Sequence, residues 1–221
     1  MKDANEANDA TVVTMNRASL REAALPDYPG IGLDDIVLVD SEALAEEAGA
    51  ALLAADVIGF DTESKPTFLK GEVSTGPHLI QLATDTCAYL FQVSPTQCSP
   101  VLKAILESTT VLKAGMGLGN DRSALKSRLG ITLNPVIDLG EVLRGSHGIG
   151  HRGTVGAKVA VAHFFGQRLQ KSKKVGTSNW ANRRLNERQL LYAANDAHVA
   201  LRIYRAWMAS KPHRESDAGA V

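Results

Sequence analysis

Four acidic residues and one tyrosine are the residues in this sequence whose types and spacing could do chemistry. Asp61 and Glu63 lie two positions apart in the run VIGFDTE, which we predict to be a strand. Because side chains alternate along a strand, both carboxylates point to one side of the sheet and can reach a single ion. A cation relieves their mutual repulsion, and carboxylate oxygens suit Mg²⁺ or Mn²⁺. An isolated Asp-x-Glu pair is more often an ordinary solvated strand end.

A second group lies on a predicted helix near the end of the chain. Tyr192 and Asp196 are four positions apart, so they share one helix face, which Val199 and Ile203 continue. An acid on a core-facing stripe requires a partner, and a metal ion would provide one. Asp121, just inside another predicted helix, is by itself better explained by the helix dipole.

The charged residues are unevenly distributed. The chain holds 24 basic and 24 acidic residues. Residues 1–63 contain 14 acids and three bases, whereas residues 143–190 contain ten bases and one acid. A basic segment can neutralise nucleic-acid phosphates, or it can be a solvated surface that faces the acidic half of the same molecule. The charge pattern alone leaves both interpretations open.

The composition is that of a globular protein with one domain. The chain has 221 residues, of which 44% are hydrophobic and 22% are charged. No apolar run approaches the roughly 20 residues that cross a bilayer, and the first residues, MKDANEAND, do not resemble a secretory signal. We therefore expect a cytoplasmic protein without a membrane partner, whose Cys87 and Cys98 are reduced.

Apolar periodicity and capping residues predict an α/β domain with a mixed sheet and helices on its faces. Residues 85–87 form a short polar link that predicts a hairpin, and Ser41 and Asn186 are expected to cap helices. The predicted domain covers 29–210, between flexible tails at 1–28 and 211–221. The predicted strands are 36–40, 57–63, 78–84, 88–93, 110–114 and 136–139, and the predicted helices are 41–55, 100–107, 120–128, 154–165 and 187–209.

Four runs of sequence resemble a known family. In order they are VIGFDTES, VLKAGMGLGNDRSAL, SNW and LLYAANDAHVALRIY. They resemble the three exonuclease motifs of the DEDD superfamily of 3′-5′ exonucleases, in the branch with tyrosine in the third motif. Ribonuclease D and the exonuclease domain of the Werner syndrome helicase belong to that branch. The resemblance covers roughly residues 36–208.

This resemblance implies a ribonuclease H-like (DnaQ-like exonuclease) fold and a site for two divalent metal ions, Mg²⁺ or Mn²⁺. Asp61, Glu63 and Asp196 would hold one ion, and Asp61 would hold the other with Asp121, which acts largely through water. Tyr192 would orient the attacking water, because a phenol with a pKa of about 10 is a poor base. The reaction would release nucleoside 5′-monophosphates from a free 3′ end of DNA or RNA, single-stranded or in a 3′ overhang.

The resemblance also favours the nucleic-acid interpretation of the basic segment, whose lysines and arginines would draw in the substrate backbone. Phe68 and His78, near the first motif, would touch a terminal base, whereas packing is the commoner role for a tryptophan such as Trp180. The predicted substrate-binding residues are Thr62, Phe68, His78, Lys171, Lys173, Lys174, Trp180 and Arg184.

Two other motifs suggest different functions. Gly115, Gly117 and Gly119 follow a strand and precede Asp138, as in a dinucleotide-binding fingerprint, but their spacing is G-x-G-x-G. The histidines of HGIGH, at 147 and 151, lack the nearby acid or cysteine that would complete a zinc site.

A non-catalytic module that binds nucleic-acid ends with the same fold is the remaining alternative. The presence of all four acids and of the tyrosine argues against it.

Overall fold

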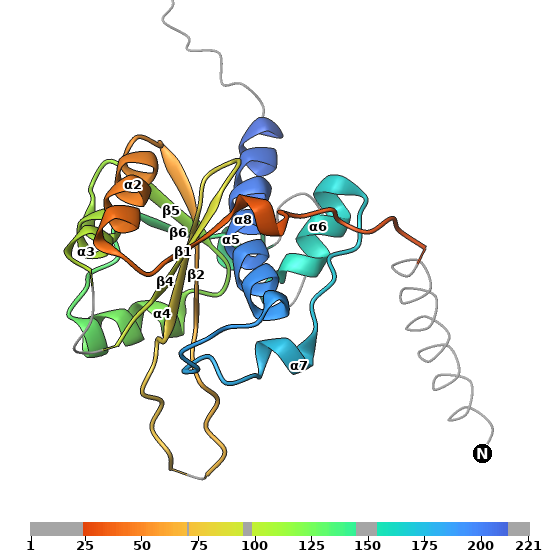
Figure 1. The fold of residues 1–221 in the computed structure, drawn as a ribbon. Helices are drawn as coiled ribbons and strands as arrows, with labels where there is room; N and C mark the ends of the chain where they lie inside the picture. The colour runs from red at the N-terminus through yellow and green to blue at the C-terminus, as the bar shows by residue number, and fades with distance from the viewer. Residues whose placement is uncertain (1–23, 70, 95–98, 145–153, 212–221) are drawn as a thin grey trace, which may run out of the picture.

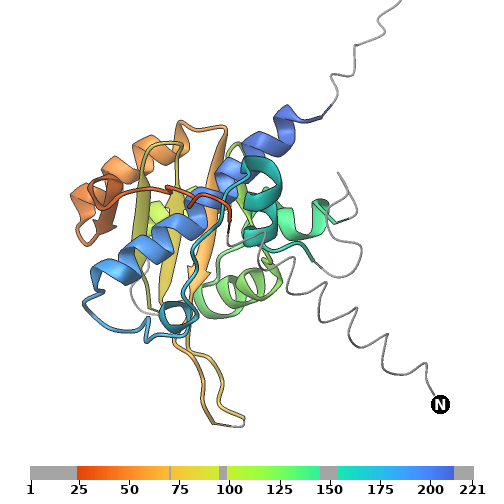
Figure 2. The same cartoon turned by 90° about the vertical axis from the view of Figure 1, so that its right-hand side faces the viewer.

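The computed structural model describes residues 24–69, 71–94, 99–144 and 154–211. A six-stranded sheet with helices on both faces forms the body of the molecule (Figures 1 and 2). The strands are β1 (Ile36–Val39), β2 (Val57–Glu63), β3 (Leu79–Ala83), β4 (Ala88–Gln92), β5 (Leu112–Gly115) and β6 (Val136–Asp138). The helices are η1 (Leu33–Asp35), α2 (Glu42–Leu53), α3 (Pro100–Glu107), α4 (Gly119–Ala124), η2 (Leu125–Leu129), α5 (Leu139–Val142), α6 (Ala157–Phe165), α7 (Lys173–Gly176) and α8 (Glu187–Ala209).

The sheet is mixed, as the sequence predicts, and its strand order is β1-β4-β3-β2-β5-β6. β3 runs antiparallel to β2 and β4, which confirms the predicted β3–β4 hairpin, while the other neighbouring pairs are parallel. Because β2 and β5 are parallel, their carboxyl ends lie at the same edge of the sheet. That edge carries Asp61 and Glu63 at the end of β2 and Asp121 in α4, the helix that follows β5.

β2 separates two apolar clusters. Ile58 and Phe60 pack in the cluster that includes residues of α2 and α3. Val57 packs in a cluster on the opposite face, together with residues of α8. Alternation along the strand therefore turns Asp61 and Glu63 toward the face that α8 covers.

The predicted helix starts are confirmed for α2 and α8. The Ser41 hydroxyl accepts a hydrogen bond from Leu44 N at 3.3 Å, as expected of an N-cap. The Asn186 side chain accepts from Gln189 N at 3.1 Å, and the Gln189 side chain accepts from Asn186 N at 3.2 Å. This capping box fixes the start of α8, the helix that carries Tyr192 and Asp196.

Some elements differ from the prediction. The helix expected over 120–128 begins at Gly119 and continues from Leu125 as the π-helix η2. The sequence did not predict the π-helix, because apolar periodicity does not distinguish its wider hydrogen bonding from that of an α-helix. Leu139 begins α5 instead of ending a strand, since the Asp138 side chain accepts from Gly140 N. α7, which Ser172 caps, is absent from the predicted helices, because a single helical turn is too short to show apolar periodicity in the sequence.

The segment before η1 contacts the body of the molecule. Residues 24–28, which we placed in the N-terminal tail, include Asp27 at 2.6 Å from the Arg168 guanidinium. The Tyr28 ring lies 5.8 Å from that of Phe165. Residues 1–23 and 212–221, in the two predicted tails, lie outside the described residues. In the described part of the chain no helix has the length and hydrophobicity needed to span a membrane, and the cytoplasmic location stays a prediction.

Candidate active site

Close packing of α8 on β2 brings the two acidic groups together. A Cβ atom at Gly59 would lie 2.0 Å from the carbonyl oxygen of Ala197, so only glycine permits this approach of the two backbones. Asp61 follows two residues later on the same face of β2, and Asp196 immediately precedes Ala197 on α8. The glycine therefore allows Asp196 to lie beside the strand that carries Asp61.

Tyr192 lies one helical turn before Asp196 and is held by α7 and Trp180. A Cβ atom at Gly176 would lie 2.6 Å from the Tyr192 hydroxyl, so the end of α7 covers this group closely. The Trp180 ring is fully buried, with its centroid 5.9 Å from that of Tyr192. Its Nε1 donates to the Gly176 carbonyl at 3.1 Å. These contacts restrict the phenol to the vicinity of Asp196.

Thr62 links the acids of β2 to Asp121. Its hydroxyl donates a short hydrogen bond to Asp121 Oδ1, and its backbone nitrogen donates to Asp61 Oδ1 at 2.9 Å. The sequence analysis assigns Thr62 to substrate binding, whereas in the structure its hydroxyl bonds to an acid. Thr62 therefore orients two of the four carboxylates.

Lys171 is the cation of this site. Its Nζ lies 2.7 Å from Asp196 Oδ2 and 5.3 Å from the centre of the Tyr192 ring. The lysine side chain is 29% exposed, whereas that of Asp196 is 5% exposed. We expected Lys171 to contact the substrate backbone, but its ammonium group is paired with the third-motif acid.

The acids interact strongly enough to alter their own pKa values. Burial raises the pKa of Asp61 well above its ordinary value, and repulsion by Asp196 and Asp121 adds to the shift. Burial raises the pKa of Glu63 to about 9, with a further contribution from Asp61. Burial raises the pKa of Asp196 to about 6, although Lys171 opposes the shift. The pKa of Asp121 is also raised by burial, against the hydrogen bond from Thr62.

The pKa values of Tyr192 and Lys171 are both raised beside these acids. Burial raises the pKa of Tyr192 to about 12, and the Asp196 carboxylate adds to the shift. Burial opposes the charge on Lys171, but attraction to Asp196 outweighs it and raises the pKa of the ammonium group. At neutral pH Tyr192 is thus a neutral hydroxyl and Lys171 is a cation, so one positive charge faces four acids.

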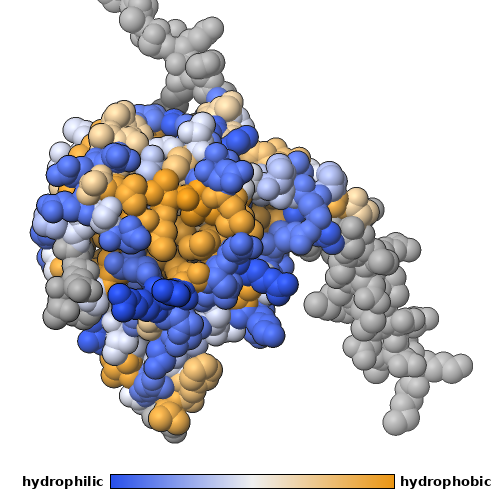
Figure 3. Space-filling model, viewed as in Figure 1, coloured by the Kyte–Doolittle hydropathy of each residue, from blue (hydrophilic) through white to orange (hydrophobic). Residues whose placement is uncertain are grey.

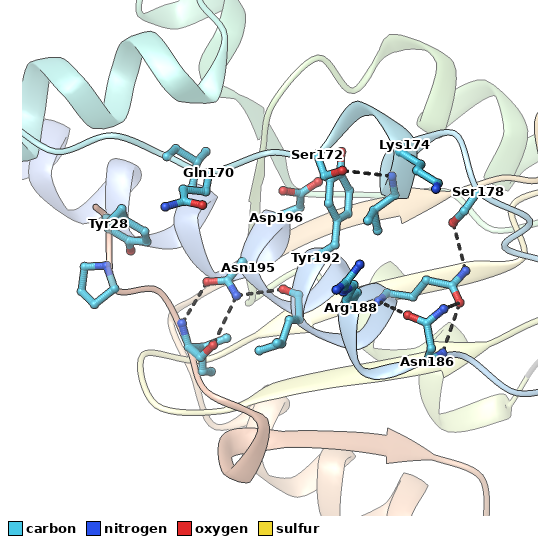
Figure 4. Close-up of a pocket in the computed structure, with 16 residues that line it drawn as sticks. Tyr28, Gln170, Ser172, Lys174, Ser178, Asn186, Arg188, Tyr192, Asn195 and Asp196 are labelled. Atoms are coloured by element: carbon cyan, nitrogen blue, oxygen red, sulfur yellow. Dashed lines mark hydrogen bonds between the residues drawn. The ribbon is translucent and has the colours of Figure 1, made fainter. Parts of the chain in front are cut away.

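A cavity of about 680 Å³ adjoins Tyr192 and Asp196 (Figure 4). Its walls come from the N-terminal half of α8, from the segment around Tyr28 and from residues 169–178, which include α7. Asn195 joins α8 to the segment around Tyr28. Its side-chain oxygen accepts from Ile31 N at 2.9 Å, and its Nδ2 donates to the Ile31 carbonyl at 3.2 Å. The cavity combines apolar side chains with the cationic Lys174 and Arg188.

His78 ends the long connection between β2 and β3, whereas Phe68 lies near the middle of that connection. His78 is at its base, where its backbone nitrogen donates to the Glu63 carbonyl at 2.9 Å and its ring bonds to Lys65 N and Thr75. Phe68 is 80% exposed near the far end of the connection, which projects from the body, with hydrophobic residues at its tip (Figure 3). The structure therefore places His78 beside the first motif but does not bring Phe68 to it.

The other predicted substrate-binding residues divide into exposed and buried ones. Lys173 and Lys174 begin α7, and Arg184 follows in the loop before α8; all three are exposed. Trp180 has no exposed surface, so its ring packs on Tyr192 and is not available for stacking on a base. Most of the basic residues that the structure describes in this segment are exposed, and among them Arg168 forms an ion pair with Asp27 of the acidic N-terminal half.

The glycine-rich turn after β5 does not have the geometry of a phosphate-binding loop. Asp138 fills it: its carboxylate accepts from Gly117 N at 2.8 Å and from Leu118 N at 2.7 Å. These are backbone donors that a dinucleotide phosphate would need. The turn therefore has a structural role, with Gly117 at a φ of +76°. The two histidines considered for zinc lie outside the described residues.

The donor set suits a hard divalent cation. Among the described residues, no three His, Cys, Asp or Glu side chains surround one point as a ready metal cluster, and Lys171 takes the position beside Asp196. The carboxylates are nevertheless oxygen donors at one edge of the sheet, and their raised pKa values show that their negative charge is poorly compensated. A divalent ion would supply the missing positive charge.

The sheet order and the acids at its edge define a ribonuclease H-like domain of the exonuclease type. Residues 36–208 match the 3′-5′ exonuclease family, and the chain belongs to that family, in the DEDD group similar to ribonuclease D and the Werner syndrome exonuclease. The chain is 30% identical over 199 residues to the bifunctional 3′-5′ exonuclease/ATP-dependent helicase WRN of Mus musculus. This match covers 87% of the chain and 14% of the mouse protein.

Solved structures have the same fold. The Nibbler EXO domain of Aedes aegypti is 27% identical, with a TM-score of 0.66 over 80% of this chain and 88% of that one. The Trypanosoma brucei RNase D complex with RNA U12 is 21% identical, with a TM-score of 0.68 over 88% and 66% of the two chains. The chain spans between 14% and 54% of the first curated relatives that it matches.

The sequence did not indicate two polar features of this region, the pairing of Lys171 with Asp196 and the buried Gln81. The Lys171–Asp196 ion pair joins a loop to a helix, and no local pattern reports such a pairing. Gln81 lies in β3 with no exposed surface and with both polar atoms of its side chain unpaired. A glutamine inside the apolar run HLIQLAT, opposite the first motif, was the available signal.

Proposed function

We propose that this protein is a metal-dependent 3′-5′ exonuclease that hydrolyses phosphodiester bonds of nucleic acids and releases nucleoside 5′-monophosphates. The observation that supports the proposal is that Asp61, Glu63 and Asp196 lie near enough to repel one another where α8 packs on β2, with Asp121 joined to Asp61 through Thr62. Membership of the 3′-5′ exonuclease family supports the same reaction.

Asp61, Glu63, Asp121 and Asp196 would hold two divalent ions, Mg²⁺ or Mn²⁺. When bound, the ions supply the Lewis acidity that activates water and stabilises charge on the phosphate oxygens. The protein supplies the carboxylates, of which Thr62 orients Asp61 and Asp121, while the close packing at Gly59 allows Asp196 to lie beside β2. Lys171, whose Nζ lies 2.7 Å from Asp196 Oδ2, would compete with an ion for that carboxylate.

Tyr192 orients the attacking water by hydrogen bonding. With its pKa raised to about 12, the hydroxyl stays protonated at neutral pH, so it donates or accepts a hydrogen bond and does not act as a base. α7 and Trp180 hold the phenol in place through contacts on two sides. A fixed hydroxyl beside Asp196 can align a water with the phosphorus atom.

The proposed substrate is a nucleic acid with a free 3′ end, single-stranded or in an overhang. Lys173 and Lys174 on α7 and Arg184 in the loop before α8 are exposed, and they would attract the phosphate backbone. The match to an RNase D that is complexed with RNA supports RNA as one substrate class. The choice between RNA and DNA depends on how the site treats a 2′-hydroxyl.

A gel time course with 5′-labelled single-stranded DNA and RNA tests the proposal. Each substrate is incubated with Mg²⁺, Mn²⁺ or EDTA. We expect a ladder that shortens from the 3′ end with either metal and no products with EDTA. Products that form equally with EDTA, or that arise by internal cleavage, would contradict the proposal.

A second candidate function is a module that binds nucleic-acid ends without hydrolysis. The Lys171 ammonium beside Asp196 favours it, since a permanent ion pair there would exclude a metal ion. The variant Asp61→Asn discriminates between the two functions. An exonuclease loses turnover and keeps end binding, whereas the module shows no turnover in either form.

A further inference from the structure

Gln81 is a buried polar residue next to the acidic site. It lies in β3 with 0% of its surface exposed, and neither Oε1 nor Nε2 of its amide has a hydrogen-bond partner. Buried amides in folded proteins are almost always paired, because an unpaired one loses its bonds to water without replacement. An unpaired amide at this depth therefore requires a specific explanation.

The pairing of β2 with β3 places Gln81 directly opposite Asp61. Residues opposite each other in an antiparallel pair project to the same face, with their Cβ atoms about 5 Å apart. Both side chains therefore lie under α8, on the face that carries the acidic site. A glutamine carboxamide is long enough to reach a carboxylate at that separation.

The residue directly opposite Gln81 on β4 and the two residues that flank it along this face of β3 are apolar. Across β4 it pairs with Leu90, and Leu79 and Ala83 flank it along β3. All three belong to one apolar cluster, which also contains Trp180 and three alanines of α8. Asp61 is thus the polar side chain among the cross-strand partners of Gln81.

We propose that Gln81 is a positioning residue for Asp61: its Nε2 donates a hydrogen bond to the Asp61 carboxylate when that carboxylate ligates a divalent cation. The inference rests on the proposed function, since it requires a metal at Asp61. One oxygen of Asp61 already accepts from Thr62 N at 2.9 Å. A donor on the other side of the carboxylate would fix its rotation about the bond to Cβ, which sets the direction of its lone pairs toward the ion.

The test compares Gln81→Met with Leu90→Met. Both place a flexible apolar side chain of similar volume under α8, on the two strands of one cross-strand pair, but the first alone removes the amide. Mn²⁺ affinity is measured by calorimetry, and the melting temperature is measured in EDTA. For Gln81→Met we expect a loss of about 10-fold in Mn²⁺ affinity, with a metal-free melting temperature at or above that of the wild type.

Leu90→Met should bind Mn²⁺ within about twofold of the wild type, since packing changes of this size leave the carboxylates in place. Wild-type Mn²⁺ affinity in Gln81→Met would overturn the inference and leave Gln81 with a purely structural role. Absence of Mn²⁺ binding by the wild-type protein would instead overturn the proposed function itself.

A second measurement uses the unmodified protein, in case Gln81→Met does not fold. The side-chain NH₂ signals of ¹⁵N-labelled wild-type protein are followed by NMR during a Mg²⁺ titration. Gln81 is assigned through its backbone and side-chain connectivity. We expect its amide protons to shift on saturation with Mg²⁺, as a new hydrogen bond requires. Signals that do not move while Mg²⁺ binds would contradict the inference.

Discussion

The two ends of the contact between β2 and α8 differ in how far the charge of their acids is balanced by a neighbouring cation. Just before β2, Asp56 accepts two hydrogen bonds from Arg205, each at 2.8 Å, and Arg205 also reaches Asp85 at 3.2 Å. The bonds from Arg205 hold the pKa of the Asp56 carboxyl below its ordinary value. This end is an exposed and compensated ion-pair group, with a structural role.

At the carboxyl end of β2 Asp196 is buried, the other three acids are half-buried, and the acids outnumber their partner. Lys171 pairs with Asp196, while burial and mutual repulsion raise the pKa values of Asp61 and Glu63. The same strand and helix thus hold compensated acids at one end and uncompensated acids at the other. The lesson is that charge balance, more than the presence of acids, distinguishes a structural group from a site that needs a cation.

The largest difference between the two ends should appear in turnover. We expect Asp61→Asn to lower nuclease turnover by about 10³-fold or more, because it removes a carboxylate common to both proposed ions. Asp56→Asn is the matched control at the other end, and its turnover should stay within about twofold of the wild type. Comparable losses from the two variants in a 3′-end degradation assay would remove the functional distinction between the ends.

Tyr192→Phe should reduce turnover by about 100-fold while leaving substrate affinity nearly unchanged. The variant keeps the ring that packs on Trp180 and removes only the hydroxyl that orients water. Tyr204→Phe, on the same helix but in the apolar cluster away from the acids, is the control. A Tyr192→Phe enzyme with full turnover would show that the hydroxyl has no part in the reaction.

The pH dependence of stability should differ in sign between the ends. The folded-state pKa of Glu63 is about 9, against an ordinary value of 4.5, so the folded protein keeps a proton that the unfolded chain releases. Stability from this group is complete below pH 4.5 and is lost as the pH rises toward 9. Asp56, with a lowered pKa, instead contributes stability that is lost as the pH falls.

Scanning calorimetry in EDTA measures this effect. We expect the melting temperature of the wild type to fall by about 5 °C or more between about pH 5 and about pH 9, and that of Glu63→Gln to fall by clearly less. Equal slopes for the two proteins would mean that Glu63 is not the group responsible. Saturating Mn²⁺ should flatten the wild-type curve, because the metal favours the ionised carboxylates.

Removal of the Lys171 ammonium group should increase the affinity of the acidic end of β2 for metal ions. We expect Lys171→Met to bind Mn²⁺ about threefold to tenfold more tightly than the wild type, because the ammonium group no longer competes for Asp196. Lys174→Met, on the exposed start of α7, is the control and should leave the affinity unchanged. Weaker Mn²⁺ binding by Lys171→Met would show that Lys171 supports the ligand geometry and does not compete with the ion.

The smallest effect is expected at the compensated end. Arg205→Met should lower the free energy of unfolding by about 1 kcal/mol, since the ion pair is largely exposed and screened. Chemical denaturation measures this change, and Mn²⁺ affinity should not change. Altered metal binding in Arg205→Met would mean that the two ends of β2 are coupled through α8.

The sequence predicts those parts of the molecule whose signals are local. Alternation in VIGFDTE places Asp61 and Glu63 on one face, and the capping box at Asn186 sets the start of α8. Asp121 is predicted only by its family motif, because an acid in the first turn of a helix is ordinarily explained by the helix dipole. Whether these residues act as proposed depends on the experiments above.

The remaining features depend on the path of the chain in space. The pairing of Lys171 with Asp196 follows from how the loop before α7 crosses α8, and the burial of Trp180 follows from its packing on Tyr192. Neither has a periodic signal in the sequence. Gln81 does stand out as a glutamine inside an apolar run, but its position opposite Asp61 and its lack of hydrogen-bond partners are properties of the assembled sheet.

Anomalous scattering from a crystal grown with Mn²⁺ tests the central claim most directly. We expect one manganese peak bounded by Asp61, Glu63 and Asp196 and a second peak toward Asp121, with the Lys171 ammonium group displaced from Asp196. A map without a peak at these carboxylates at saturating Mn²⁺, with the Lys171–Asp196 ion pair intact, would contradict it.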